Sequence, residues 1–294
     1  MSNPDIYKER VPRRTSRHWI RRVDYEVSEW GDPKQPLLFW LHGWGDASAT
    51  FQFVVDQFSE DWFIVAPDFR GFGGSAADVA AFWFPDYLAD LDRLIDIYSP
   101  NEPARLIGHS MGANVGGLFA GAMPARVSAF VNVEGFGLND TDPGEAPARY
   151  RRWIKAGRSE PAFSSYPDFS SLAERIMKRS PRIGRPRAEF VARCWAAESD
   201  GQVVLRANPR HKLPNAVLYR RAESEACWRN VKAPVLLVAG SDSEFANAAD
   251  SRLNTGSLDL PFPQASTVVI EDSGHMMHFE APRALASAIE SFLA

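Results

Sequence analysis

The sequence predicts an α/β protein built on a mostly parallel, doubly wound sheet. Short apolar runs of strand length recur along the chain and alternate with segments of helical periodicity. Strands that alternate with helices form parallel sheets covered on both faces, with the reactive loops at the carboxyl ends of the strands. The apolar runs lie at 37–41, 62–66, 104–108, 128–133, 234–239 and 266–271, and an alternating pattern predicts one more strand over 17–30.

The segments between these runs contain the predicted helices. In 87–98, Leu88, Leu91 and Leu94 recur at the spacing of one helix face. About a hundred residues separate the strand at 128–133 from the next one, which is far more than a crossover helix needs, so we expect an insertion there. Further helix-like runs lie in that insertion at 172–178 and 188–197, and an amphipathic helix follows Pro282.

The composition narrows the range of possible functions. A hydrophobic content of 45% and a charged content of 24% are typical of a globular protein, and the net charge of −4 gives no reason to expect nucleic-acid binding. Residues 1–22 are polar and basic without the apolar segment of a signal peptide, and no run reaches the length of a membrane span. We therefore expect a cytoplasmic protein with neither a nucleic-acid nor a membrane partner.

Metal ions and cofactors are not indicated. Cys194 and Cys227 are the only cysteines, too few for a disulfide framework and without metal-ligand spacing. The glycine-rich stretch 71–74 lacks the lysine of a phosphate-binding loop. The sequence predicts a protein with no metal site and no cofactor.

Ser110 is the candidate nucleophile. It lies in Gly108-His109-Ser110-Met111-Gly112, between the apolar run 104–107 and a helix-like run of small residues. A serine on so sharp a strand-to-helix turn is forced into unfavourable backbone angles that only small neighbours tolerate, and its hydroxyl is held clear of the backbone. This pattern is typical of a nucleophile elbow.

A second glycine-bounded loop offers an oxyanion hole. The apolar run 37–41 ends at His42-Gly43-Trp44-Gly45. Acyl transfer needs two backbone N–H groups directed at the developing oxyanion, one from the residue after the nucleophile and one from a loop of this kind. The candidates are the amides of Met111 and Trp44.

The candidate base is His275. A serine at its ordinary pKa is a weak nucleophile and needs a neighbouring base whose pKa lies near the working pH, which imidazole provides. His275 follows Ser273-Gly274 on the loop beyond the strand at 266–271, so it is placed to reach the elbow. His278, three residues later, is the alternative.

With these motifs in order, the chain resembles the α/β-hydrolase superfamily along almost its whole length. The resemblance implies that Ser110 is the nucleophile, His275 the base, and Trp44 and Met111 the donors of the oxyanion amides. Four stretches carry it, namely His42-Gly43-Trp44-Gly45, Asp68-Phe69-Arg70-Gly71-Phe72-Gly73-Gly74-Ser75, Gly108-His109-Ser110-Met111-Gly112 and Gly274-His275-Met276-Met277-His278.

The triad acid departs from the commonest family pattern. Most members carry an aspartate three residues after the glycine that closes the strand following the cap. Here that glycine is Gly240 and the third residue is Ser243, with Asp242 one position early and Glu244 one late. The other candidate, Glu134, follows the strand after the elbow helix, as in many haloalkane dehalogenases, which however use an aspartate nucleophile. Glu134 and Asp242 both stay candidates, with Glu134 preferred.

The resemblance also implies a helical cap. We expect a core of residues 1–137 and 216–294, with a cap at 138–215. Aromatic residues of the cap can either pack or contact substrate. The residues expected to contact the substrate are His42, Gly43, His109 and Trp153.

These features together predict a cofactor-free serine hydrolase that acts on a small acyl substrate, such as an ester, through a covalent acyl-enzyme. A serine nucleophile argues against dehalogenase and epoxide hydrolase chemistry, for which this family uses aspartate. Lactone and C–C bond hydrolysis stay open, as does a non-catalytic ligand-binding protein on the same scaffold. The sequence does not indicate an oligomeric state.

Overall fold

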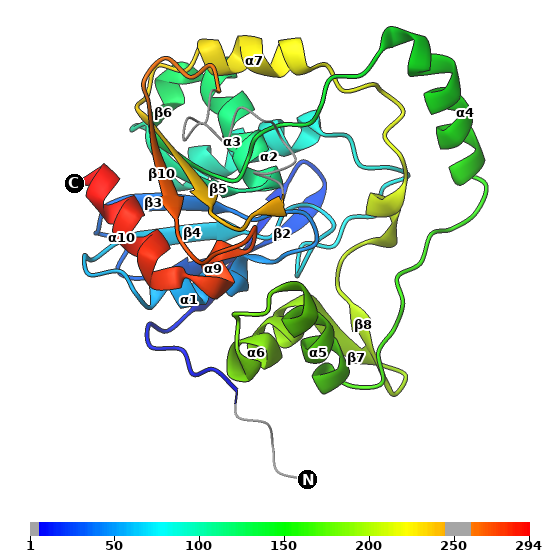
Figure 1. The fold of residues 1–294 in the computed structure, drawn as a ribbon, viewed down its shortest axis with the longest axis horizontal. Coiled ribbons are helices and arrows are strands. Elements are labelled where there is room, and N and C mark those ends of the chain that lie inside the picture. Colours follow the sequence, from blue (N-terminus) through cyan, green and yellow to red (C-terminus); the bar gives the residue numbers. More distant parts are fainter. Residues whose placement is uncertain (1–5, 245–259) are drawn as a thin grey trace.

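The computed structural model describes residues 6–244 and 260–294 (Figure 1). One sheet contains strands in the order β1-β2-β4-β3-β5-β6-β9-β10. The pairs β1–β2 and β2–β4 are antiparallel and the other neighbours run parallel, which confirms the predicted mostly parallel α/β sheet. The strands are β1 (Arg14–Ile20), β2 (Val23–Trp30), β3 (Leu37–Leu41), β4 (Phe63–Pro67), β5 (Ala104–His109), β6 (Val127–Val133), β9 (Val235–Gly240) and β10 (Ala265–Ile270).

The prediction of a single strand over 17–30 is wrong. Arg21 and Arg22 have φ angles of 43° and 68°, and they connect β1 and β2 as a hairpin in which Ile20 pairs with Val23. A two-residue turn with positive φ at both positions matches the twist of the flanking strands. The alternation of side chains continues through so short a turn, and two arginines carry none of the usual turn signals, so the pattern looked like one strand.

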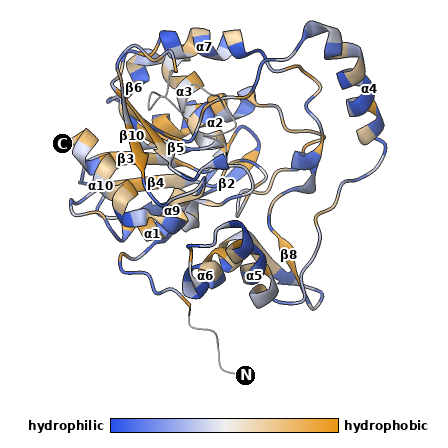
Figure 2. Ribbon diagram, in the orientation of Figure 1, coloured by the Kyte–Doolittle hydropathy of each residue, from blue (hydrophilic) through white to orange (hydrophobic). Residues whose placement is uncertain are grey.

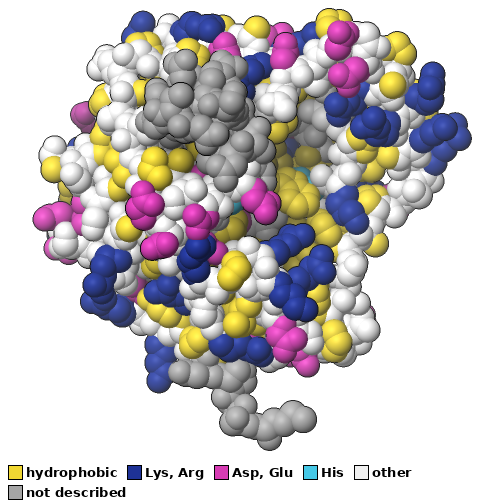
Figure 3. Space-filling model, in the orientation of Figure 1, with side chains coloured by type: hydrophobic (Ala, Val, Ile, Leu, Met, Phe, Trp, Pro, Cys, Tyr) yellow, Lys and Arg dark blue, Asp and Glu magenta, His cyan; other side chains and the backbone are white. Residues whose placement is uncertain are grey.

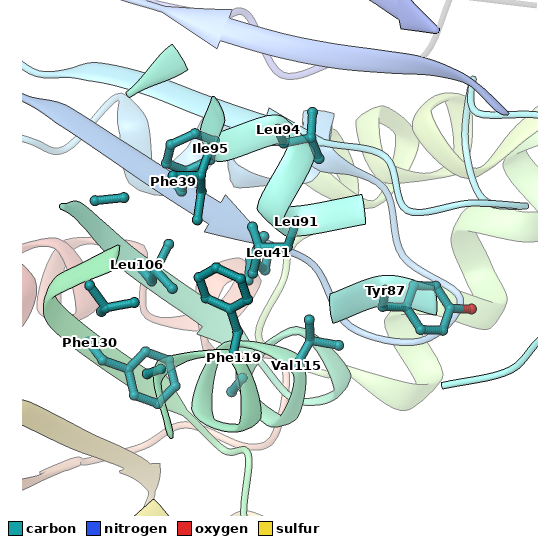
Figure 4. Close-up of a cluster of buried hydrophobic side chains, with 14 of the residues drawn as sticks. Phe39, Leu41, Tyr87, Leu91, Leu94, Ile95, Leu106, Val115, Phe119 and Phe130 are labelled. Carbon is teal, nitrogen blue, oxygen red and sulfur yellow. The ribbon is translucent and has the colours of Figure 1, made fainter. Parts of the chain in front are cut away.

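Helices cover both faces of the sheet (Figures 1 and 2). On β3, Phe39 and Leu41 pack in a cluster with residues of α2, α3 and α7, and part of this cluster is drawn in Figure 4. Leu38 and Trp40, which point to the other face, pack with residues of α1, α9 and α10. Burial on both faces explains why the central strands have continuous apolar sequences. These helices are α1 (Gln52–Val55), α2 (Pro85–Tyr98), α3 (Met111–Ala122), α7 (Arg221–Arg229), α9 (Met277–Glu280) and α10 (Pro282–Leu293).

The predicted insertion lies between β6 and β9. Two of its helices, α5 (Phe169–Arg179) and α6 (Arg185–Trp195), form an apolar cluster that extends to Phe53 and Phe279 of the core. These two helices confirm the helix-like run at 172–178 and, up to Trp195, the run at 188–197, whose last two residues belong to a strand instead. A small antiparallel sheet of β7 (Ala196–Ser199) and β8 (Gln202–Leu205), which the sequence analysis did not predict, follows them.

The helix α4 (Ala146–Ala156) of the insertion differs from α5 and α6 because none of its residues is buried. It stands away from the sheet at the upper right of Figure 1. The next helix in the core, α7, instead packs against α3. Among the helices of residues 6–244 and 260–294, none combines the length and the apolar character needed to cross a membrane.

Candidate active site

Ser110 sits on a strained turn between β5 and α3. Its φ and ψ angles are 51° and −114°, a conformation that costs energy for a residue with a side chain. The turn is held in place because the Ser110 N–H donates to the Val133 carbonyl at 2.8 Å. A Cβ at Gly108 would lie 2.5 Å from the backbone of Ala113, and one at Gly112 would lie 2.2 Å from the Leu41 carbonyl oxygen. Close packing of the backbone therefore requires both glycines of the pentapeptide.

His275 is oriented by Glu134. Its Nδ1 lies 2.9 Å from Glu134 Oε2. A carboxylate oxygen that accepts this hydrogen bond requires the hydrogen to be on Nδ1, and in the neutral imidazole the lone pair is then on Nε2. The Glu134 carboxylate is buried, and its Oε1 accepts a hydrogen bond from the Gly240 N–H at 2.8 Å while Oε2 also accepts one from the Ser243 hydroxyl.

The sheet explains why Glu134 reaches this position. Glu134 directly follows β6, and β6 pairs in parallel with β9, with Val133 opposite Val238. The Glu134 N–H donates to the Val238 carbonyl at 3.0 Å, which extends this pairing by one residue. At that point the φ angle of Glu134 turns to 60°, an uncommon value for a residue other than glycine. The carboxylate is therefore anchored by the ends of two strands.

Asp242 lies elsewhere. Its side chain is about half exposed and forms an ion pair with Arg182, which belongs to the insertion between α5 and α6. Its backbone N–H donates to the Ser273 carbonyl at 3.0 Å. Of the two acids that the sequence analysis kept open, the structure thus brings Glu134 to His275 and brings Asp242 to the insertion.

His278, the alternative base, is also engaged elsewhere. It is buried, and its Nε2 lies 3.1 Å from Asp46 Oδ2. Together with His109, these residues form the one group, among those that the structure describes, whose ligand atoms lie close enough to hold a metal ion, all within 4.8 Å of one another. His278 does not share the carboxylate that orients His275.

The loop after β3 lies against the elbow. A Cβ at Gly43 would be 3.3 Å from Ser110 Cβ, which shows how closely the two backbones approach. His42 is buried, and its Nε2 accepts a hydrogen bond from the Phe69 N–H at 2.8 Å, so the ring fixes the loop from below. Within the described residues, the backbone N–H groups of Trp44 and Met111 have no hydrogen-bond acceptor.

A cavity opens beside these two residues. It has a volume of about 330 Å³, and both Trp44 and Met111 line it. Most of the remaining lining comes from aromatic and aliphatic side chains of the segment before α2 and of the insertion. Figure 3 shows the hollow between the body of the molecule and the insertion, with Lys and Arg side chains around it. The other lining residues include Phe82, Trp83, Phe84, Tyr87, Trp153, Arg210, His211, Leu213, Pro214 and Val217.

The four expected substrate contacts differ in position. Trp153 lines the cavity. His42 and His109 are both buried and are not among the residues that line it. Gly43 lies between them, packed on the elbow. His109 instead donates its Nε2 hydrogen to the backbone carbonyl of His275, at 2.8 Å. The structure therefore places these two histidines in the buried interior rather than at the wall of this cavity.

His211 was missed by the sequence analysis. Its ring is stacked between those of Phe72 and Phe82, with centroid separations of 3.8 and 3.5 Å. Burial lowers the pKa of His211 to about 4, so the imidazole is neutral at pH 7. His211 lies far along the chain from Phe72 and Phe82, so no local motif could have indicated this stack.

The fold and this arrangement of residues define an α/β hydrolase. The chain belongs to the family described by the alpha/beta hydrolase fold, whose model matches residues 36–282. This confirms the resemblance seen in the sequence.

Its relatives include hydrolases. The serine hydrolase-like protein of Danio rerio is 28% identical over 90% of this chain and 83% of the relative. The 2-(acetamidomethylene)succinate hydrolase of Mesorhizobium japonicum is 26% identical over 93% of each chain. Among solved structures, a thioesterase domain from the curacin biosynthetic pathway matches with a TM-score of 0.85 at 23% identity, covering 95% of this chain and 99% of that domain. The general class of the protein is therefore that of the hydrolases.

Proposed function

We propose that this protein is a cofactor-free serine hydrolase that cleaves an ester or a related acyl substrate through a covalent acyl-enzyme. The observation that carries the proposal is the hydrogen bond between His275 Nδ1 and the buried Glu134 carboxylate, formed beside the strained turn of Ser110. A nucleophile, a base and an acid that orients the base are the three parts that this chemistry needs.

Each residue then has a definite part in the reaction. Glu134 holds His275 with Nε2 as the proton acceptor and stabilises the imidazolium that forms. His275 removes the proton of Ser110 as its oxygen attacks the acyl carbon, and the N–H groups of Trp44 and Met111 stabilise the oxyanion. His275 returns the proton to the leaving group. Water activated by the same imidazole then releases the acid and restores Ser110.

The lining of the cavity favours substrates with an apolar acyl group. The cavity adjoins the two proposed oxyanion donors, so the group attached to the reacting carbonyl would enter it. The lining is mainly aromatic and aliphatic. Its arginine, Arg210, is already paired with Glu160 at 2.8 Å, so it brings no uncompensated charge. A medium-length aliphatic or an aromatic acyl group is the substrate class that such a surface favours.

A series of p-nitrophenyl esters from acetate to decanoate, with the benzoate and an aliphatic lactone, tests this proposal. We expect ester hydrolysis that rises from acetate to a medium chain or the benzoate, and that is lost in Ser110→Ala. Turnover of charged acyl groups, such as the succinate half-ester, should be lower. If the protein shows no ester turnover and no labelling by a fluorophosphonate, the proposal is contradicted and a ligand-binding protein is favoured instead.

A further inference from the structure

Asp46 is a buried carboxylate, and both of its oxygens have hydrogen-bond partners. It lies two residues after Trp44, in the loop that follows β3. Its Oδ1 accepts hydrogen bonds from the Ala47 N–H at 2.8 Å, from the Thr50 hydroxyl at 2.9 Å and from Trp195 Nε1 at 2.7 Å. Its Oδ2 lies 3.1 Å from His278 Nε2. A buried charge that has so many donors is held firmly in one place.

These partners belong to parts of the molecule that are far apart in the sequence. Trp195 ends α6 in the insertion, whereas His278 is part of α9, three residues after His275. Asp46 is thus the point at which the insertion, the loop of Trp44 and the loop of His275 meet. Burial alone would raise the pKa of Asp46, but its polar neighbours, which include His278, His42 and Trp195, together outweigh burial, so the pKa lies below its ordinary value.

His109 connects this group to the base. Its ring lies between those of His275 and His278, with centroids 4.8 and 4.5 Å away. Its Nε2 donates to the His275 carbonyl, so the backbone of the base is fixed from the same side. Burial lowers the pKa of His109 well below its ordinary value, so this contact is made by a neutral ring.

We propose that Asp46 is a positioning residue that fixes the position of the Trp44 loop relative to His275. Through its hydrogen bond to Asp46, Trp195 makes that position depend on how the insertion packs against the core. This inference rests on the function proposed above. Asp46 touches neither the proposed nucleophile nor its base, so it acts through the residues around it. Among the hydrogen bonds of the described residues, that of the Trp195 indole N–H connects the insertion to Asp46.

The substitution Trp195→Phe tests the contact because it removes the N–H and keeps an aromatic ring. We expect kcat for the preferred p-nitrophenyl ester to fall about tenfold, with KM little changed, since one hydrogen bond to a charged acceptor is lost. The rate of fluorophosphonate labelling should fall by the same factor. The melting temperature should fall by only a few degrees.

Trp62→Phe is the matched control. Trp62 is also half-buried, and its indole N–H has no partner within the described residues. It precedes β4 at the opposite end of the sheet. The same substitution there should leave kcat, KM and labelling unchanged. An equal loss of kcat in both variants, or wild-type kcat in Trp195→Phe, would overturn the proposal.

Asp46→Asn completes a double-mutant cycle. An asparagine can still accept from Trp195, Thr50 and Ala47, so the fold should persist while the charge is lost. We expect a larger fall in kcat than in Trp195→Phe. Adding Trp195→Phe to Asp46→Asn should then cost less than it does in the wild-type background, because the hydrogen bond it removes there ends on a neutral acceptor. Additive losses would contradict this coupling. Failure of the proposed function would show separately, as wild-type protein that no fluorophosphonate labels.

Discussion

The Ser243 hydroxyl donates a hydrogen bond to Glu134 Oε2, the oxygen that also accepts from His275. Ser243 occupies the position, three residues after Gly240, at which most α/β hydrolases carry the triad aspartate. In this protein the carboxylate that hydrogen-bonds to His275 comes from the end of the neighbouring strand, and the residue at the usual position donates to that carboxylate. Because β6 and β9 pair in parallel, their ends lie side by side, and we expect a carboxylate at either position to reach His275.

Ser110→Ala should abolish covalent labelling by a fluorophosphonate probe and reduce ester turnover to the background rate. Only an activated serine reacts with such a probe, and the proposed base acts through this one hydroxyl. Gel fluorescence after labelling measures the effect directly. Ser243→Ala is the control. Ser243 belongs to the same site, but the Ser243→Ala variant should still be labelled by the probe. Labelled Ser110→Ala would place the nucleophile elsewhere.

Glu134→Gln should lower kcat by about a thousandfold or more while the protein stays folded, because the amide keeps the size of the side chain and loses the charge that stabilises the imidazolium. Asp242→Asn should remain close to wild type, since its exposed carboxylate pairs with Arg182 and such pairs contribute little to stability. Turnover and thermal melting of both variants should be measured together. A stably folded but inactive Asp242→Asn beside an active Glu134→Gln would reverse the assignment.

Placing a carboxylate at position 243, the usual position in the family, should restore part of the activity that Glu134→Gln loses. In Glu134→Gln combined with Ser243→Asp, we expect at least about a tenfold gain in kcat over Glu134→Gln alone, because the new carboxylate can reach His275 Nδ1. Ser243→Asp in the presence of Glu134 is the control. Two carboxylates in contact cannot both ionise easily, so that variant should be less active and less stable than wild type. A double variant no better than Glu134→Gln would show that position 243 cannot serve His275.

The sequence analysis identified the residues that local motifs define and missed those that depend on distant contacts. Ser110 and its two glycines follow from the backbone crowding of one turn, which a short stretch of sequence encodes. The choice between Glu134 and Asp242 depends on which carboxylate reaches His275, and that is decided by strand pairing across many residues. The same holds for the contacts of Asp46 with Trp195 and His278 and for the ring stack of His211, which join distant parts of the chain.

His211 should make the stability of the protein depend on pH. Its folded pKa of about 4 lies below the ordinary value, so the fold favours the neutral ring. Its contribution is fully present above about pH 6.5 and is lost progressively as the pH falls through about 4. His211→Phe keeps three stacked rings without a titrating group, and we expect urea midpoints at pH 7.5 and pH 5 to differ less than in wild type. Part of the difference should persist, since burial lowers the pKa of His109 too. An unchanged difference would show that His211 does not contribute.

The two halves of the insertion are attached to the core unequally. Arg187 of α6 donates to the Phe279 carbonyl at 3.0 Å, and Trp195 donates to Asp46, whereas α4 buries no residue at all. Backbone amides of α4 should therefore exchange with deuterium far faster than those of α5 and α6 in the same protein. Trp153 of α4 lines the cavity, so we expect the wall of the cavity to move more easily on the side of α4 than on the side of the core. An acyl chain longer than the cavity would then be accommodated by displacement of α4 rather than rejected, and the enzyme would discriminate weakly among long chains.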